Sequence, residues 1–278
     1  MSNASPQVIL DSKELKEIAK LHFPGGELIC SIIIRLLKFH KLNKIYQAYS
    51  GPGGLHFIEY AIKSLNLKYE VNKEALQYIP QNEAFVTISN HPYGGVDGIG
   101  IFKLLLPVRP DYKTVSNYMM SRLKPLQNNF FTVNPFISGR SVTMNITGIK
   151  ASMQHLKDGH PLGLFPAGEV SSYNNDYPGI SDKKWDKSIM RLVQKANVPV
   201  IPIYFHGTNS KMFHLIGRIN PFFRTAKIPS ELMNKHKQTI KITIGKPIDP
   251  DTQKNYVSID DYTDFLRQQT YTLAHNEN

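Results

Sequence analysis

A histidine and a carboxylate that could transfer a proton lie six residues apart after an apolar run. Residues 84–89 are short, apolar and rich in β-branched side chains, so they predict a buried strand, which His91 and Asp97 follow. An imidazole accepts a hydroxyl or amine proton at neutral pH, and a carboxylate at its other nitrogen fixes the tautomer. We therefore predict that His91 is a general base and that Asp97 orients it.

The chain between these two residues must fold back before their side chains can meet. In an extended chain they would lie up to ~20 Å apart, and Gly94 and Gly95 permit the positive φ angles that a tight return needs. A second interpretation is that Asp97 caps a helix over residues 98–106 while His91 hydrogen-bonds within the loop. The pair alone favours neither interpretation.

Three blocks of this sequence resemble those of a known enzyme family. The segment from Asn90 to Asp97 resembles the Asn-His-Asp loop of the glycerolipid acyltransferases, which move a fatty acyl chain from a thioester onto a lysolipid or glycerol phosphate. The loop has one residue more than the common form and looks like that of the hemolysin-like branch, which includes acyltransferases of lyso-aminolipids. Leu-Phe-Pro-Ala-Gly-Glu-Val-Ser at 164–171 and Val-Pro-Val-Ile-Pro-Ile-Tyr at 198–204 follow in the family's order. The resemblance covers roughly residues 80–210.

Some positions depart from the family's pattern. Ala167 stands where the second block usually has glutamate, and Glu169 lies two positions later. Asn134 stands where the family has a phosphate-binding arginine, and Arg140 is the candidate to replace that arginine. A site without this charge-assisted contact suits a less charged acceptor, so these departures weaken the expectation of a phosphate-bearing one.

The resemblance also implies where substrates bind. Backbone amides near Gly168 could form an oxyanion hole, although an ordinary tight turn after a strand is an equally good interpretation of that block. The implied substrate-binding residues are Asn90, Gly95, Asn134, Arg140, Phe165, Pro166, Ala167, Gly168 and Glu169.

Composition restricts the partners of this 278-residue chain. It has 33 basic and 22 acidic residues, a net charge of +11, which favours an anionic membrane surface, a phosphorylated acyl donor or nucleic acid. No nucleic-acid-binding motif occurs, so we expect no nucleic-acid partner. The single Cys30 excludes an internal disulfide, and we predict neither a metal site nor a cofactor. A basic cluster, read either as a solvated helix face or as an anion-binding surface, comprises Lys183, Lys184, Lys187, Arg191 and Lys195.

Strand-like and helix-like segments alternate along most of the chain. This order predicts an α/β fold with a mainly parallel central sheet covered by helices on both faces. Ligands bind at the carboxyl ends of the strands in such sheets, which places residues 90–91, 166–168 and 206–207 on one rim. The expected strands are 84–89, 112–116, 163–165, 198–205 and 240–244, and the expected helices are 98–106, 119–126, 141–158, 185–196 and 259–275.

The first fifty residues predict a helical membrane-binding arm. Helices are expected over 11–21 and 27–49, and the apolar stretch 28–37 is too short to cross a bilayer. Arg35, Lys38, Lys41 and Lys44 follow the start of this stretch, as in helices that lie in a membrane interface. The alternative is a core helix with a solvated end. Gly-Pro-Gly-Gly at 51–54 breaks the helical pattern and predicts a boundary between an arm (1–50) and an acyltransferase domain (51–278). The segment lacks the lysine-serine ending of a phosphate loop, which favours a hinge.

Together with the resemblance, these observations predict a membrane-associated O-acyltransferase that is cytoplasmic and peripheral on the inner face of the membrane. It would transfer an acyl chain from acyl-CoA or acyl carrier protein to a lysolipid hydroxyl. Within the family, the rival acceptors are glycerol 3-phosphate and lysophosphatidic acid. A serine hydrolase would need a G-x-S-x-G elbow, which the sequence lacks. A protein that binds membranes without catalysis remains an alternative that thioester turnover would distinguish.

Overall fold

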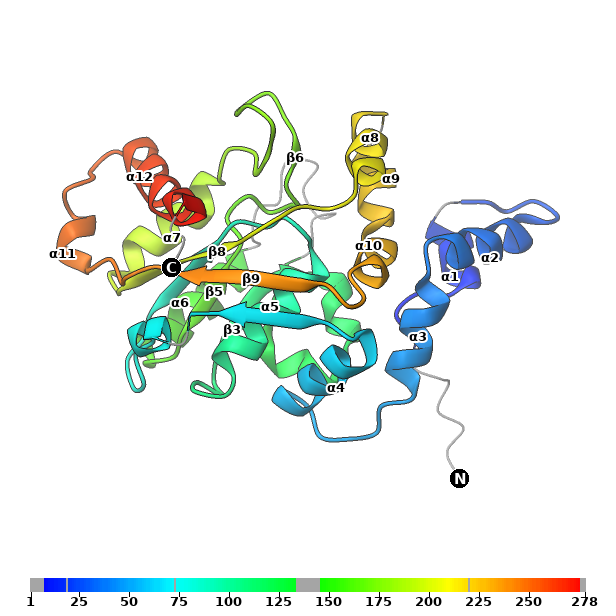
Figure 1. Cartoon of the computed structure of the whole chain (residues 1–278), viewed down its shortest axis with the longest axis horizontal. Coiled ribbons are helices and arrows are strands. Elements are labelled where there is room, and N and C mark those ends of the chain that lie inside the picture. The colour runs from blue at the N-terminus through cyan, green and yellow to red at the C-terminus, as the bar shows by residue number, and fades with distance from the viewer. Residues whose placement is uncertain (1–7, 19, 73, 134–145, 220, 276–278) are drawn as a thin grey trace.

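The computed structural model describes residues 8–18, 20–72, 74–133, 146–219 and 221–275. A seven-stranded sheet crosses its centre, in the order β1-β9-β8-β2-β5-β3-β4 (Figure 1). Its strands are β1 Lys68–Val71, β2 Val86–Ser89, β3 Lys113–Asn117, β4 Phe130–Val133, β5 Leu162–Leu164, β8 Val200–Phe205 and β9 Thr239–Ile244.

The sheet is mainly parallel, as predicted. Strands β8, β2, β5, β3 and β4 run in one direction. Strand β9 is antiparallel to β8, and β1 is parallel to β9, so these two edge strands run the other way. The five predicted strands are present with bounds shifted by a few residues at most, whereas β1 and β4 were not predicted.

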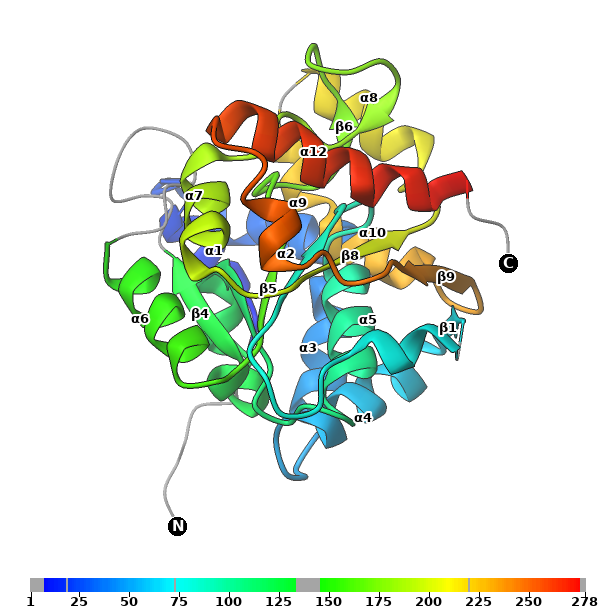
Figure 2. The same ribbon diagram turned by 90° about the vertical axis from the view of Figure 1, so that its left-hand side faces the viewer.

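Helices cover both faces of this sheet. One core cluster joins the sheet to α4 and α5 through side chains such as Phe57 and Phe102. A second cluster joins the opposite face to α6, α7 and α12 through side chains such as Met190 and Leu266. Figure 2 shows α6 and α7 on one side of the sheet and α4 and α5 on the other. The bounds are α4 Leu55–Leu65, α5 Gly95–Leu105, α6 Ile146–Lys157, α7 Lys187–Ala196 and α12 Ile259–Thr272.

Several predicted helices have different bounds or a different type. The segment expected to be a helix over 119–126 forms two 3-10 helices, Tyr118–Arg122 and Lys124–Asn129. The first part of the helix expected over 141–158 lies outside the described residues, and α6 covers the rest. The last helix ends in the 3-10 turn Leu273–His275. Proline and asparagine in 124–129 explain the tighter turns, because both are poor residues for an α-helix interior.

Helices α8 (Lys211–Ile219), α9 (Pro221–Ala226) and α10 (Ile228–Asn234) lie between β8 and β9 in the chain, and none was predicted. In Figure 1 they form a column beside the carboxyl edge of the parallel strands. Helix α10 contacts α5, the helix that carries Asp97. A short antiparallel ribbon, β6 (Ser172–Tyr173) with β7 (Ile180–Ser181), and the helix α11 (Pro250–Gln253) complete the described elements, together with the 3-10 helix Glu74–Tyr78.

The amino-terminal segment folds into α1 (Ser12–Ile18), α2 (Gly26–Leu36) and α3 (Phe39–Gln47). The helix expected over 27–49 is broken at Lys38, which has a φ of 63°. Leu10, Ile34 and Phe39 form a small core of their own, whereas Tyr46 packs into the main core. Among the described residues, no helix has both the length and the apolar character needed to cross a membrane. The division at residue 50 stays a prediction.

Candidate active site

Asn90 ties the start of the active-site loop to the neighbouring strand. All four residues of β2 are buried, and Asn90 follows them with 3% exposure. Its Nδ2 donates to the carbonyl of Phe205 at 2.9 Å, and the Phe205 N–H donates to its Oδ1 at 2.7 Å. Both ends of the amide therefore join β2 to β8. A substrate contact by Asn90 stays a prediction.

The turn after β2 brings Asp97 back towards His91. Gly94 has a φ of 87°, a conformation that side chains rarely permit. Gly95 is the first residue of α5 and is not at positive φ, so the expectation of two such glycines is wrong for Gly95. The Asp97 Oδ2 accepts the N–H groups of Tyr93 and Gly94 at 2.8 and 2.9 Å. The helix thus begins three residues earlier than predicted, with Asp97 in its first turn.

The same oxygen of Asp97 faces the imidazole. His91 Nδ1 lies 2.9 Å from Asp97 Oδ2, and the Asp97 side chain is fully buried while that of His91 is 18% exposed. The ring N–H does not point at the carboxylate well enough to make a regular hydrogen bond. Catalytic hydrogen bonds often tighten only when substrate binds. Asp97 therefore both caps α5 and stands where it can orient His91, so the two interpretations are compatible.

The imidazole is held on one face by the second sequence block. The rings of His91 and Phe165 stack with centroids 4.2 Å apart and an interplanar angle of 29°. Because Nδ1 faces Asp97, Nε2 is the nitrogen left to accept a proton from a substrate. Phe165 is the first residue after β5, which pairs in parallel with β2. The predicted meeting of these two strand ends is thus present.

A buried carboxylate that sequence reasoning missed holds the backbone of His91. Asp182 is fully buried, and its Oδ1 accepts the N–H of His91 at 3.2 Å and the hydroxyl of Ser171. Ser171 donates its own N–H to the His91 carbonyl at 2.9 Å. The peptide groups on both sides of His91 are therefore fixed by the segment that follows β5. No local pattern marks Asp182, because its partners are distant in sequence.

Two aromatic side chains complete the surroundings of Asp182. Trp185 Nε1 donates to the Oδ2 of Asp182 at 3.2 Å. The backbone N–H of Asp182 donates to the hydroxyl of Tyr271 at 2.9 Å. Burial raises the pKa of Asp182, and the hydrogen bonds from Ser171 and His91 oppose that rise. The carboxyl oxygens thus accept three donors, so Asp182 fixes the geometry of the loop rather than facing solvent.

The second block forms a tight turn after β5. Gly168 has a φ of 69° and donates its N–H to the carbonyl of Phe165 at 2.9 Å. This amide is used within the turn, so the turn interpretation holds for Gly168 and an oxyanion role for its N–H is not supported. The carbonyl of Pro166 accepts the N–H of Asp186, which caps α7, and Ala167 is 2% exposed. Contacts of these residues with a substrate stay predictions.

Glu169 lies between two cations rather than open to an acceptor. Its Oε1 is 3.2 Å from Lys183 Nζ, and its Oε2 accepts from Arg224 Nη2 at 3.0 Å. Arg224 comes from α9 and is almost fully buried. Glu169 thereby connects the second block to α9. Its role in binding substrate stays a prediction.

Helix α10 and the residue after it cover the outer side of the loop. The hydroxyl of Tyr93 donates to the His206 carbonyl at 2.7 Å, which joins the loop to the end of β8. Lys235 Nζ lies 4.6 Å from the centroid of the Tyr93 ring and donates to the carbonyl of Thr208 at 2.9 Å. Burial, and then the charge of Asp97, raise the pKa of Tyr93 to about 12. Tyr93 therefore stays neutral at physiological pH.

Asn134 and Arg140 lie outside the described residues. On the surface of α7, Lys187 Nζ is 2.7 Å from Asp260 Oδ1, an ion pair with α12 that fits a solvated helix face. Among the described residues, no group of three or more His, Cys, Asp or Glu side chains could hold a metal ion.

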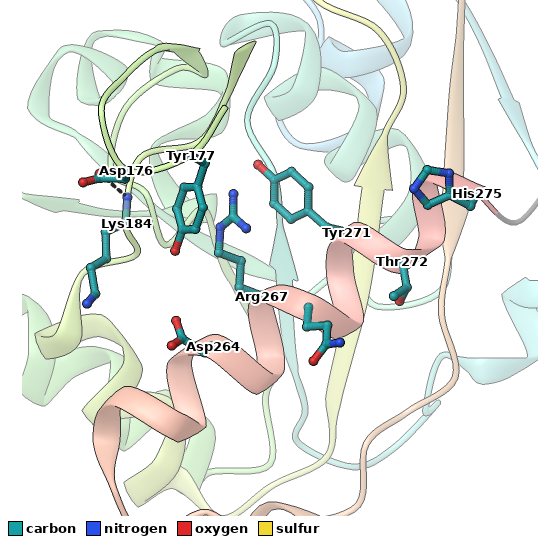
Figure 3. A pocket seen from close by; sticks show the side chains of 9 residues that line it. Asp176, Tyr177, Lys184, Asp264, Arg267, Tyr271, Thr272 and His275 are labelled. Atoms are coloured by element: carbon teal, nitrogen blue, oxygen red, sulfur yellow. Dashed lines mark hydrogen bonds between the residues drawn. The ribbon is translucent and has the colours of Figure 1, made fainter. Parts of the chain in front are cut away.

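A surface cleft lies behind Asp182, between α12 and the loop that joins β6 to β7. Its volume is about 690 Å³. Figure 3 shows the Arg267 guanidinium between the rings of Tyr177 and Tyr271, and its central carbon lies 3.4 and 4.1 Å from their centroids. Such stacking holds the loop against α12. Tyr271 thus contacts both this cleft and the Asp182 backbone.

Comparison with known proteins identifies the class. An α/β sheet with a His-Asp pair at the carboxyl end of a central strand is a suitable scaffold for acyl transfer by general base catalysis. The family model described as "Acyltransferase" matches residues 13–277. The chain therefore belongs to this acyltransferase family and is an acyltransferase, which confirms the resemblance seen in its sequence blocks.

Individual relatives are more distant. The chain is 24% identical over 259 residues to a lyso-glycine lipid O-acyltransferase of Phocaeicola vulgatus, covering 88% of this chain and 87% of that protein. It is 22% identical to a protein of the same name from Bacteroides thetaiotaomicron, covering 88% and 89%. The solved structure of the 1-acyl-sn-glycerophosphate (LPA) acyltransferase PlsC from Thermotoga maritima aligns over 96% of this chain and 89% of that chain, with 14% identity and a TM-score of 0.48.

Proposed function

We propose that this protein is a membrane-associated O-acyltransferase that moves a fatty acyl chain from an acyl thioester to a lysolipid hydroxyl. The observation that carries the proposal is the buried Asp97 carboxylate 2.9 Å from His91 Nδ1, with His91 partly exposed at the carboxyl end of β2. Within this family, such a pair suits a base that activates a hydroxyl. Membership of the family supports the reaction class, and the names of the two relatives support the lysolipid acceptor.

The reaction needs one base and no covalent enzyme intermediate. His91 Nε2 takes the proton of the acceptor hydroxyl while its oxygen attacks the thioester carbonyl carbon. The tetrahedral intermediate collapses as the carbon–sulfur bond breaks, and the thiolate takes the proton from the imidazolium to leave as a free thiol. The negative charge of Asp97 stabilises the imidazolium between these two steps. The products are the acylated lipid and free CoA or carrier-protein thiol.

The acyl donor is a thioester of CoA or of acyl carrier protein. Both carriers are anionic, and the net charge of +11 favours either one. The test of the whole proposal is to incubate purified protein with palmitoyl-CoA and a lyso-aminolipid in mixed micelles, and to follow free thiol and esterified lipid together. Equal release of the two products supports acyl transfer. Failure to turn over either CoA or carrier-protein thioesters would instead support a membrane-binding protein without catalysis.

We propose a lyso-aminolipid as the acceptor. The printed names of the two relatives specify a lyso-glycine lipid, and Ala167 places a small apolar side chain where a glutamate is usual in the family. An absent bidentate arginine contact removes part of the affinity for a phosphate group. Glycerol 3-phosphate and lysophosphatidic acid are the alternative acceptors, and they require another cation to bind the phosphate.

In direct competition at equal concentration, we expect an N-acylated glycine lipid with a free hydroxyl to be acylated faster than lysophosphatidic acid or glycerol 3-phosphate. Product ratios from one reaction, measured by mass spectrometry, give the preference directly. Arg140→Ala is the matched variant, since Arg140 is the candidate phosphate contact. A preference for the phosphate acceptors that this substitution abolishes would contradict the aminolipid proposal.

The amino-terminal arm supports a peripheral position on the inner face of the membrane. Leu28, Ile29, Ile32 and Leu36 lie exposed on one side of α2, with 42% to 72% of their surface accessible. Arg35, Lys41 and Lys44 lie nearby in the sequence and are also exposed. An apolar face beside basic residues is the pattern of an interfacial helix that prefers anionic lipid.

Vesicle sedimentation checks this position. We expect Lys41→Gln/Lys44→Gln to weaken binding to anionic vesicles by roughly thirtyfold, because each juxtamembrane charge contributes about 1 kcal/mol. Binding to neutral vesicles should hardly change. Lys254→Gln serves as the control, since Lys254 pairs with Asp251 on α11, far along the chain from the arm. Equal loss in the control, or equal binding of wild type to neutral and anionic vesicles, would contradict an electrostatic role for the arm.

A further inference from the structure

Helix α8 has one face packed against the protein and one apolar face directed outward. Phe213 and His214 are buried, and His214 Nε2 lies 2.8 Å from the hydroxyl of Thr208. Met212, Leu215 and Ile219 lie on the outer face, with 58%, 54% and 83% of their surface exposed. Their spacing of three and four residues places them in one stripe along the helix.

Helix α9, which contacts α8, adds a further exposed apolar side chain. Phe223 is 56% exposed, so the two helices together present four large apolar side chains outward. Exposed apolar residues are common singly, but a contiguous group usually indicates an interaction site. We call this surface, Met212, Leu215, Ile219 and Phe223, the α8–α9 face.

The exposed charges on α8 are basic. No Asp or Glu occurs from residue 187 to residue 230, whereas Lys211, Arg218, Arg224 and Lys227 lie within or directly beside the two helices. Lys211 and Arg218 are exposed, and Arg218 covers the ring of Tyr173 at 4.7 Å. Arg224 and Lys227 are paired with Glu169 and Glu231, so Lys211 and Arg218 are the cations left for a partner. Exposed apolar side chains beside such cations are complementary to an anionic lipid surface.

The α8–α9 face also lies close to the amino-terminal arm. Helix α10 contacts both α9 and α3, and Lys38 Nζ donates to Asn234 Oδ1 at 2.6 Å. Figure 1 shows α8, α9 and α10 as a column beside α1 to α3. The described part of the chain thus includes a group of exposed apolar residues on α2 and another on α8–α9, in neighbouring parts of the fold.

We propose that the α8–α9 face is a second membrane contact, which docks on an anionic bilayer together with the arm. This inference rests on the proposed function, because a lysolipid acceptor requires access to a membrane. The side chains of the α8–α9 face enter the headgroup region, and Lys211 and Arg218 contact lipid phosphates. Two membrane contacts made together bind a bilayer more strongly than either alone.

The position of the α8–α9 face links docking to the active site. Ile228, the first residue of α10, lies so close to the loop that a Cβ on Gly94 would be 3.1 Å from its Cγ2. Arg224 of α9 pairs with Glu169 in the second sequence block. Helix α9 is therefore in contact with the second sequence block, and α10, which follows it, is in contact with the loop that carries His91. Docking therefore places the membrane, which holds the lysolipid acceptor, beside the carboxyl edge of the sheet.

An acidic carrier protein is the other partner that a basic surface could attract. Contacts with such a protein depend mainly on charge pairs, whereas the α8–α9 face consists of four apolar side chains that are each more than half exposed. Leu and Ile gain affinity by leaving water for an apolar environment, which a bilayer supplies over its whole area. The observations therefore favour the bilayer.

The test compares the full-length double variant Leu215→Glu/Ile219→Glu with wild type. The vesicles consist of phosphatidylcholine with about 30% phosphatidylglycerol, which supplies the anionic surface. We expect at least about tenfold weaker vesicle binding, because two exposed apolar side chains that would enter the bilayer are lost and two charges of the wrong sign are added. Val257→Glu is the matched control, since Val257 is 89% exposed and lies before α12. It should bind vesicles as wild type does.

Two further measurements keep the inference separate from the proposed function. Transfer from a soluble short-chain acyl-CoA to a lyso-aminolipid in mixed micelles is measured without vesicles, and its absence in wild type would overturn the proposed function alone. Unchanged vesicle binding by the double variant, or equal loss in Val257→Glu, overturns the docking inference alone. Lost turnover with acyl carrier protein together with unchanged vesicle binding would assign the α8–α9 face to the carrier protein instead. If the double variant unfolds, Ile219→Ser, at the most exposed position, replaces it.

Discussion

His91→Ala is expected to lower kcat by ~10²–10⁴-fold, because the variant lacks the base that removes the acceptor proton. The imidazole is partly exposed and lies on the rim of the sheet, so its loss should leave the melting temperature close to that of wild type. The measurement is release of free thiol from acyl-CoA at saturating acceptor, with circular dichroism as the check on folding. A folded variant with near-wild-type turnover would show that His91 is not the base.

The chain contains a matched control for this experiment. His160 Nδ1 lies 2.6 Å from Asp111 Oδ2, so it also forms a His-Asp pair. This pair precedes β5 and therefore lies at the opposite edge of the sheet from His91. His160→Ala should keep near-wild-type turnover, because a pair at the amino ends of the strands does not face the site. Similar losses in the two variants would point to a general effect of removing a histidine.

Asp97→Asn separates the two roles of Asp97. The amide oxygen of the variant can still accept the N–H groups of Tyr93 and Gly94, so the start of α5 should be kept. The charge that stabilises the imidazolium is lost, and kcat should fall by roughly 10²-fold or more. A variant that melts like wild type yet has lost this activity would indicate orientation of His91. Near-wild-type kcat would leave Asp97 with only its structural role.

The sequence predicted those parts of the site whose residues are close in the chain. His91 and Asp97 are separated by one short loop, and the apolar run before them predicts a buried strand, so both the pair and its place at a strand end followed from local patterns. The first residue of α5 was not predicted from local patterns. A helix that begins with Gly-Val-Asp-Gly has weak propensity, and its start is fixed by the hydrogen bonds of Asp97.

Parts of the fold that depend on distant contacts were not predicted. Strand β1 is four residues long and half buried, and it is ordered by pairing with β9, far away in sequence. Helices α8 to α10 are only six to nine residues long, and α10 buries the polar side chains of Ser230 and Glu231, so its pattern does not indicate an apolar buried face. Tertiary packing decides such elements, and periodicity within one segment does not contain that information.

Asp182 is the clearest case of a site residue that only the tertiary structure reveals, and its role as a positioning residue for His91 can be tested. Asp182→Ala removes the acceptor for the His91 N–H, the Ser171 hydroxyl and Trp185 Nε1. The loop that carries the base is then no longer fixed from this side. A displacement of the base by about 1 Å can cost ~10²-fold in rate, so kcat should fall by about that factor while KM changes much less.

Two further variants decide whether this loss reflects positioning or general destabilisation. Asp182→Asn keeps an oxygen for the His91 N–H and should recover most of kcat, although its amide cannot accept from Trp185 Nε1.

Gln253→Leu is the matched control, because Gln253 is also buried and lies at the edge of the sheet opposite the site. Its amide donates to the carbonyls of Val198 and Ile248 near the start of β8. Each variant leaves buried polar groups unpaired, at a cost of ~1–3 kcal/mol for each group. If Gln253→Leu, with a similar loss of melting temperature, lowers kcat as much as Asp182→Ala does, Asp182 has no special relation to His91. If only the Asp182 variants lower kcat, and Asn restores it, the buried carboxylate keeps the base in position.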